Sequence, residues 1–230
     1  MNSISPNLNI MIKAAEKASK ILIRDFVTNS DKKAEKIIIE ELLKSKKRFS
    51  VLSEETGEIK NNDLENTWLI DPIDGTLNFL HGLPHFAISI AHRCNDEILS
   101  GLIFDPIKNE MFYAEKNNGA FFNNQRMRVY NKKSIDECLF ASNKKNKNVS
   151  NLSVRNLGSA ALDMAYVGSG RFDGFFQKNL NLWDIAAGII IVKEAGGVTN
   201  EINLLSNSKI DIMAGSNAIY ENMVKNLNNF

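Results

Sequence analysis

The sequence predicts an α/β fold, an α+β layered sandwich in which helices and sheets alternate. Apolar residues recur at helical spacing near the N-terminus, short β-prone segments follow, and strongly apolar helices return in the second half. Blocks of helices and strands in this order are typical of layered α/β proteins rather than of bundles or β-sandwiches. The chain has 230 residues, of which 43% are apolar, so it can bury a substantial core.

The first half predicts two helices packed on an antiparallel sheet. Amphipathic helices are expected at residues 7–24 and 31–44, with Asp31 as a candidate N-cap of the second. Short strands are expected at 49–52 and 67–70. Residues 86–92 and 98–104 form a predicted hairpin around Asn95-Asp96, and a further strand pair is expected at 111–113 and 120–122.

The second half predicts a smaller α/β unit. Helices are expected at 158–167, 183–195 and 218–227, and strands at 172–176, 198–199 and 210–214. The polar segment 144–151 is the best candidate for a boundary. We therefore expect an N-terminal α+β subdomain at 1–142 that carries the metal-binding motifs and a C-terminal α/β subdomain at 143–230, joined in one compact functional unit.

Composition narrows the class of protein. The 28 Lys and Arg residues nearly balance the 27 Asp and Glu residues, which argues against a dedicated nucleic-acid binder. Two cysteines, Cys94 and Cys138, cannot build a disulfide framework, so a reducing compartment and a cytoplasmic location are expected. The N-terminus shows no signal-peptide core, and no stretch approaches the roughly 18 apolar residues of a membrane span.

The segment from Trp68 to Phe79 carries the clearest chemical signal. Asp71 ends an apolar strand, Pro72 is expected to end the strand ladder, and Gly75 allows a close backbone approach before a short helix. Asp71 and Asp74 beside a helix start suit both a hard divalent cation and a phosphate ester. The alternative is a structural turn in which both acids cap local N–H groups.

Other acids occupy comparable positions. Glu54 and Glu55 follow a strand, where a pair of acids is costly unless it is solvated or bound to cations. Asp184 lies in the first turn of an apolar helix, and Asp31 stands near the start of another. For these two acids, the alternative is that each complements a helix dipole.

Taken in order, these segments resemble the inositol monophosphatase family, including its bacterial extragenic-suppressor type. The resemblance covers nearly the whole chain. It rests on segments 25–31 (DFVTNSD), 53–55 (SEE), 68–79 (WLIDPIDGTLNF), 158–162 (GSAAL), 170–176 (GRFDGFF), 183–188 (WDIAAG) and 194–197 (EAGG).

The resemblance implies a Mg²⁺ cofactor, two or three ions in each active site. The implied metal ligands are Glu54, Asp71, the backbone carbonyl of Ile73, Asp74 and Asp184. Glu54, Thr76 and Asp31 are the implied catalytic residues, which organise the nucleophilic water. The implied substrate contacts are Asp74, Gly75, Thr76, Gly158, Ser159, Ala160, Gln177 and Asp184, with the N–H groups of Gly75 and Thr76 holding the phosphate.

Two departures from the family pattern bear on these assignments. Gln177 stands where many members have a glutamate that contacts a ring hydroxyl, although glutamine can also donate or accept a hydrogen bond. Family members also have additional residues at the point where Arg24 meets Asp25 in this sequence. Their absence puts the third metal position in question.

The function expected from the resemblance is Mg²⁺-dependent hydrolysis of a small phosphate monoester, above all inositol 1-phosphate, by a metal-activated water. Related enzymes act on fructose 1,6-bisphosphate, histidinol phosphate or a nucleotide 3′-phosphate, and these remain alternatives. A regulator of transcription or rRNA processing is the alternative from another class. The resemblance also implies a phosphorylated polyol as substrate, a homodimer and inhibition by lithium.

Overall fold

The computed structural model describes residues 4–24, 30–132, 134–143, 152–206 and 208–227. Both N-terminal helices are confirmed, as α1 (Pro6–Arg24) and α2 (Ser30–Ser45). The second helix begins at Ser30, so Asp31 lies inside its first turn and is not the N-cap. The predicted segment 25–29 lies outside the described residues. None of the helices in the described ranges is long and apolar enough to cross a membrane.

The first sheet is larger than predicted. Its strands are β1 (Phe49–Ser53), β2 (Gly57–Ile59), β3 (Asp63–Asp74), β4 (Ala87–Cys94), β5 (Glu97–Asp105), β6 (Glu110–Glu115), β7 (Gly119–Phe122) and β8 (Gln125–Met127), in the order β2-β1-β3-β4-β5-β6-β7-β8. The prediction of an antiparallel sheet is wrong at one place, because β1 and β3 pair in parallel. The chain reverses into β2 and reverses again before β3, so β3 regains the direction of β1.

Pro72 does not end its strand, contrary to the prediction. β3 continues to Asp74, and its pairing with β4 is interrupted after Asp71 and resumes with Asp74 opposite Ala87. Proline lacks the N–H that a ladder needs, so the strand accommodates it within an irregularity rather than by stopping. The short helix expected next is confirmed as α3 (Thr76–Leu80).

The second sheet follows in the order β10-β9-β11-β13-β12. Its strands are β9 (Leu139–Ala141), β10 (Ser153–Arg155), β11 (Gly174–Leu180), β12 (Val198–Thr199) and β13 (Ile210–Gly215). The strand expected at 172–176 begins two residues later, because the N–H of Phe172 still bonds to Tyr166 of the preceding helix. Neither β9 nor β10 is among the predicted strands, although the residues of β9 are apolar.

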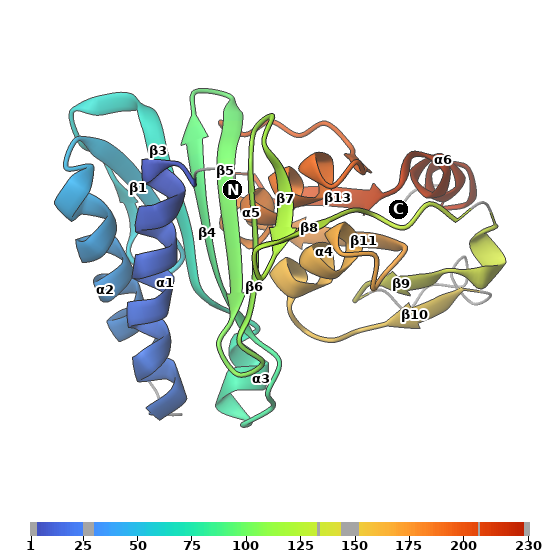
Figure 1. The fold of residues 1–230 in the computed structure, drawn as a ribbon, viewed down its shortest axis with the longest axis horizontal. Coiled ribbons are helices and arrows are strands. Elements are labelled where there is room, and N and C mark those ends of the chain that lie inside the picture. Colours follow the sequence, from blue (N-terminus) through green and yellow to red (C-terminus); the bar gives the residue numbers. More distant parts are fainter. Residues whose placement is uncertain (1–3, 25–29, 133, 144–151, 207, 228–230) are drawn as a thin grey trace.

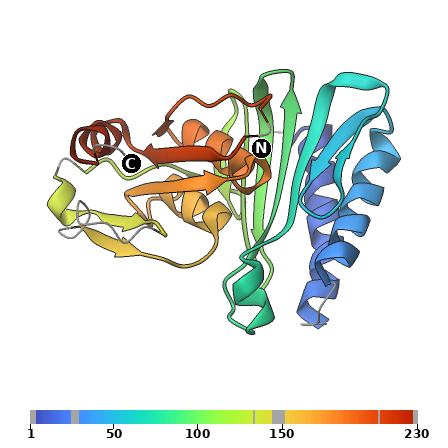
Figure 2. The ribbon, with the colours of Figure 1, turned by 180° about the vertical axis from the view of Figure 1, so that it is seen from behind.

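Helices and sheets alternate in layers, which confirms the predicted fold class. α1 and α2 cover one face of the first sheet, and Figures 1 and 2 show both helices side by side there. α4 (Ala160–Gly168) and α5 (Leu182–Glu194) pack together against the opposite face and also contact the second sheet. α6 (Asn217–Asn226) closes a small cluster beyond the second sheet.

The change from the first sheet to the second falls between Met127 and Leu139, a stretch that also holds a 3-10 turn, η1 (Ile135–Glu137). The segment 144–151, where the boundary is predicted, lies outside the described residues. The division into 1–142 and 143–230 therefore stays a prediction.

Candidate active site

The predicted acids meet where several elements end. Asp71 and Asp74 lie in the last four residues of β3 and are buried, with only 2% and 8% of their surface exposed. Glu54 follows β1, and its N–H bonds to the carbonyl of Ile70 at 3.2 Å, which fixes the turn beside β3. Asp184 reaches the same place from the first turn of α5.

The pKa directions of these carboxyl groups reflect burial first and the charges of neighbouring acids second. Burial raises the pKa of Asp71 well above its ordinary value, and the charges of Asp74, Glu54 and Asp184 raise it further. The pKa of Asp74 is raised to about 7, mainly by burial, against the opposing effect of hydrogen bonds from Ser159 and the start of α4. The acids are therefore close enough to repel one another, which is unfavourable without a compensating cation.

Glu54 and Asp184 complete this set of acids. Glu54 is exposed as a residue, yet partial desolvation is the main cause that raises the pKa of its carboxyl, with contributions from Asp184, Glu55 and Asp31. Burial likewise raises the pKa of Asp184, although hydrogen bonds from Asn181 oppose the shift. The carboxylate of Asp184 accepts the Asn181 N–H at 2.8 Å, so its helix-capping role is real as well.

The end of β3 and the start of α3 are held by local hydrogen bonds. The N–H of Ile73 donates to Oδ1 of Asp71 at 2.9 Å, as the structural-turn alternative expects. The hydroxyl of Thr76 donates to the carbonyl of Ile73 at 3.0 Å. Gly75 precedes α3 with φ of 94°, a left-handed conformation that favours glycine. Local capping and proximity to the other acids therefore coexist.

Glu35 and Asn78 are two positioning residues that the sequence reasoning missed. Glu35 on α2 is 1% exposed, accepts the N–H of Glu55 at 2.9 Å and bonds the hydroxyl of Thr56, so it fixes the turn that carries Glu54. The sequence offered one indication of this role, because Glu35 follows Ala34 on the apolar face of α2, where a charged residue needs a partner. Asn78 gave no such signal, because one of its partners, the carbonyl of Leu157, lies 79 positions away in the chain.

Among the residues that the structure describes, no three His, Cys, Asp or Glu side chains form a ready-made metal cluster. A hard cation bound here would need further oxygen ligands, such as backbone carbonyl groups, water or a substrate phosphate, which is the usual situation for Mg²⁺. The remaining predicted substrate contacts lie at the start of α4 and on β11. Ala160 is buried in the first turn of α4 and Gly158 is exposed just before it, whereas Gln177 lies half-buried on β11 opposite Ile212.

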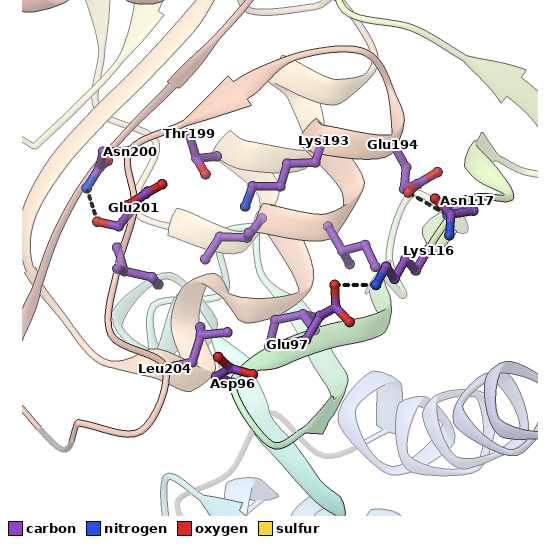
Figure 3. Close-up of a pocket in the computed structure, with 14 residues that line it drawn as sticks. Asp96, Glu97, Lys116, Asn117, Lys193, Glu194, Thr199, Asn200, Glu201 and Leu204 are labelled. Atoms are coloured by element: carbon purple, nitrogen blue, oxygen red, sulfur yellow. Dashed lines mark hydrogen bonds and ion pairs between the residues drawn. The ribbon is translucent and has the colours of Figure 1, made fainter.

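A cavity of about 680 Å³ lies elsewhere, beside the C-terminal half of α5 (Figure 3). Its polar side chains are largely satisfied within the protein. Glu97 pairs with Lys116, and Glu194 accepts the N–H groups of Asn117 and Gly119, each at 2.8 Å. Its lining residues on α5, from Ile189 to Glu194, are five to ten positions after Asp184, so they lie roughly 8–15 Å along the helix from that acid. We therefore locate the candidate active site at the acids.

Comparison with known proteins supports this reading. The model of the inositol monophosphatase family matches residues 4–228. An inositol-1-monophosphatase of Rhizobium meliloti is 40% identical over 83% of each chain, and the Nus factor SuhB of Escherichia coli K12 is 36% identical over 96% of each chain. The crystal structure of extragenic suppressor protein suhB from Bartonella henselae is 39% identical, with a TM-score of 0.92 over 98% of this chain and 99% of that chain. These findings confirm the predicted resemblance and support phosphatase chemistry in a family that is generally metal-dependent.

Proposed function

The chain belongs to the inositol monophosphatase family, and on this premise we propose that it hydrolyses a small phosphorylated polyol, inositol 1-phosphate first among the candidates, with Mg²⁺ as its cofactor. The observation that carries the proposal is the meeting of Asp71, Asp74, Glu54 and Asp184 at the start of α3. A homodimer and inhibition by lithium stay predictions from the resemblance, and a cytoplasmic location stays a prediction from the cysteine content.

The donor set fits Mg²⁺. The converging side chains offer only oxygen atoms, and the neighbours that raise the pKa of Asp71 are all acids. Asp71, Asp74, Asp184 and Glu54 would hold the ions with the carbonyl of Ile73, and two ions are the minimum that this charge suggests. Mg²⁺, when bound, supplies neutralisation of the phosphate charge and acidification of a bound water.

The residues of this chain would orient the reacting groups. The hydroxyl of Thr76 donates to Ile73, so its oxygen lone pairs can accept a hydrogen from the attacking water. Glu54 accepts the second hydrogen, and Asp31 on α2 lies near enough to add its charge to that of Glu54. The N–H groups of Gly75 and Thr76, at the open start of α3, would bind phosphate oxygens as their charge grows.

On the alcohol side, Gly158, Ala160 and Gln177 would contact the leaving polyol. Glutamine at 177 keeps a hydrogen bond to a ring hydroxyl but removes the negative charge of a glutamate. Phosphates of other polyols therefore remain competing substrates, and a substrate panel decides among them.

The first prediction concerns Asp74→Asn. We expect kcat/KM for inositol 1-phosphate with Mg²⁺ to fall about 100-fold or more, because several kcal/mol of transition-state stabilisation depend on the metal. Steady-state hydrolysis by the purified chain measures this, with fructose 1,6-bisphosphate, histidinol phosphate and a nucleoside 3′-phosphate assayed in parallel, each with and without Mg²⁺.

Asp96→Asn is the matched control, since it removes the same charge from an exposed turn between β4 and β5. Its rates should equal those of the unmodified chain. Equal rates for Asp74→Asn would refute the site assignment, and a panel in which another phosphate is preferred would replace inositol 1-phosphate as the substrate.

The names of the relatives favour one second candidate function. A relative named Nus factor is 36% identical over nearly the full length of both chains. We therefore also propose that the protein binds a component of the transcription machinery or an RNA. Binding to such a partner that persists in Asp74→Asn would separate this role from phosphate hydrolysis.

A further inference from the structure

The start of α4 is hydrogen-bonded to the end of β3, through Ser159 and Asp74, which are 85 positions apart in the chain. Ser159 is the N-cap of α4 and is 1% exposed. Its hydroxyl donates to Oδ2 of Asp74 and accepts the N–H of Leu162 at 3.2 Å. The N–H of Ala161 donates to the same Asp74 oxygen at 2.8 Å.

These bonds decide what the Ser159 hydroxyl can do. A serine hydroxyl has a single hydrogen to donate, and here that hydrogen is directed to Asp74. One of its two lone pairs accepts the N–H of Leu162, and the residue is closed off from solvent. Ser159 is therefore poorly placed to donate to a substrate, in contrast to the role that the family resemblance implies.

The same bonds orient the Asp74 carboxylate. Two donors hold Oδ2, and the N–H of Ala160 adds a further hydrogen bond to the carboxylate. The positive end of the α4 dipole also favours the ionised carboxylate. A fixed carboxylate loses less conformational freedom when it binds a cation, and groups that orient a metal ligand strongly influence metal affinity.

Further hydrogen bonds near Asp74 also hold the loop before α4 against the turn after β3. The side-chain amide of Asn78 donates to the carbonyl of Leu157 at 2.7 Å and to that of His85 at 2.8 Å. Gly158 has φ of 83°, and a Cβ atom there would lie 2.9 Å from the Asn78 amide. The loop before α4 can therefore approach the turn after β3 only with glycine at this position.

We propose that Ser159 is a positioning residue for Mg²⁺ binding, which holds Asp74 in its ligating orientation, rather than a residue that contacts the substrate. This inference rests on the proposed function, because it takes Asp74 as a metal ligand. It assigns the start of α4 to the metal site and links that helix to the first sheet through one carboxylate.

The test measures Mg²⁺ binding to the purified chain by isothermal titration calorimetry, without substrate. Ser159→Ala should weaken Mg²⁺ binding by about 10- to 100-fold, the usual effect of removing a partner of a metal ligand. Ser159→Thr keeps the hydroxyl and should retain the affinity. Ser159→Gly keeps much of the capping ability but loses the hydroxyl, so it should bind Mg²⁺ as weakly as Ser159→Ala even where the alanine variant folds poorly.

Ser216→Ala is the matched control. Ser216 is also a buried N-cap, on α6, and accepts the N–H of Ile219, but no acid of the site contacts it. This variant should lower the thermal unfolding midpoint much as Ser159→Ala does while leaving Mg²⁺ affinity unchanged.

Three results would overturn the inference. Unchanged Mg²⁺ affinity in both Ser159→Ala and Ser159→Gly contradicts it, as does an equal loss of affinity in Ser216→Ala. A raised KM at saturating Mg²⁺ with unaltered metal binding would make Ser159 a substrate contact instead. If the unmodified chain itself fails to bind Mg²⁺, the proposed function fails first, and the variants are not needed to show it.

Discussion

At the residue scale, burial decides which side chains are chemically unusual. Asp71 and His92 are both nearly inaccessible to solvent, and in each case burial opposes the charged form. For Asp71 the neighbours are other acids, so the cost of the charge points to a cation. For His92 the contacting side chains are aromatic or neutral, and the charge of Lys46 adds to the effect of burial while that of Asp63 opposes it, so the imidazole stays uncharged.

His92 shows how fully a neutral imidazole can be satisfied. Its Nε2 lies 2.8 Å from Oδ1 of Asn66, and its Nδ1 lies 3.2 Å from the side-chain amide of Asn7. The ring stacks on Phe49 and packs against Trp68, with centroid distances of 5.2 Å and 5.1 Å. One donor and one acceptor are used, which is the pattern of the neutral ring.

A pH dependence of stability follows from this histidine. Burial lowers the pKa of His92 from 6.5 to about 4, so the unfolded chain takes up the proton first as the pH falls. The stabilising contribution of the neutral His92 to the free energy of unfolding is complete above pH 6.5. It falls by about 3 kcal/mol as the pH is lowered from 6.5 to 4. Urea unfolding at several pH values should show a shallower slope in His92→Phe than in the unmodified chain.

The exposed His81 provides the control for this experiment. His81→Gln should leave the pH slope of the unfolding free energy unchanged. Identical slopes for His92→Phe and the unmodified chain would contradict the assignment.

At the scale of elements, α5 connects the site to the core. Its first turn carries Asp184, and its middle packs so closely on β5 that only glycine fits at position 101. A Cβ atom at Gly101 would lie 2.7 Å from Cα of Ala187 and 2.8 Å from its carbonyl oxygen. Both are backbone atoms, so the helix as a whole would have to move.

We therefore expect Gly101→Ala to cost about 1–3 kcal/mol of unfolding free energy, the usual effect of overpacking. Because α5 carries Asp184, Mg²⁺ affinity should fall in the same variant. Urea unfolding and calorimetric Mg²⁺ titration measure the two effects.

Gly215→Ala serves as the comparison, since the nearest atom to its added Cβ would be the carbonyl oxygen of Asp173 at 3.1 Å. We expect a smaller loss of stability there and no change in Mg²⁺ binding. A Gly101→Ala variant as stable as Gly215→Ala would show that α5 can shift without cost.

At the scale of the whole molecule, α4 and α5 form a shared layer between the two sheets. The largest core cluster includes Leu69 of the first sheet, Ile185 of α5 and Ile212 of the second sheet. Neither sheet can lose this layer without exposing apolar side chains to water, which is the dominant cost in unfolding. The two predicted subdomains should therefore unfold together.

The two tryptophans test this expectation from separate places. Trp68 is fully buried in the first sheet, and Trp183 lies in the first turn of α5. In Trp68→Phe and in Trp183→Phe, the remaining tryptophan fluorescence should follow the same urea transition as far-UV circular dichroism. Separate fluorescence and dichroism midpoints in either variant would show that the halves unfold independently.

Local patterns predicted much of this fold. The helices α1, α2 and α5 and the β4–β5 hairpin follow from periodicity and turn residues within short windows. The short strands β2, β8, β9 and β10 were missed because three residues give too little pattern to detect. The parallel pairing of β1 with β3 was also missed, since strand direction depends on how intervening turns add up.

The sequence by itself determined the type of each long element and the acids at their ends, because helix period, strand alternation and turn chemistry act over a few neighbouring residues. Only the tertiary structure decided which of these acids face one another, that Glu35 fixes the Glu54 turn, and that Ser159 bonds to Asp74. Such contacts join residues as distant in the sequence as Glu54 and Asp184, and they form only when the layers pack. The chemistry of the site therefore depends on packing that no local pattern of residues encodes.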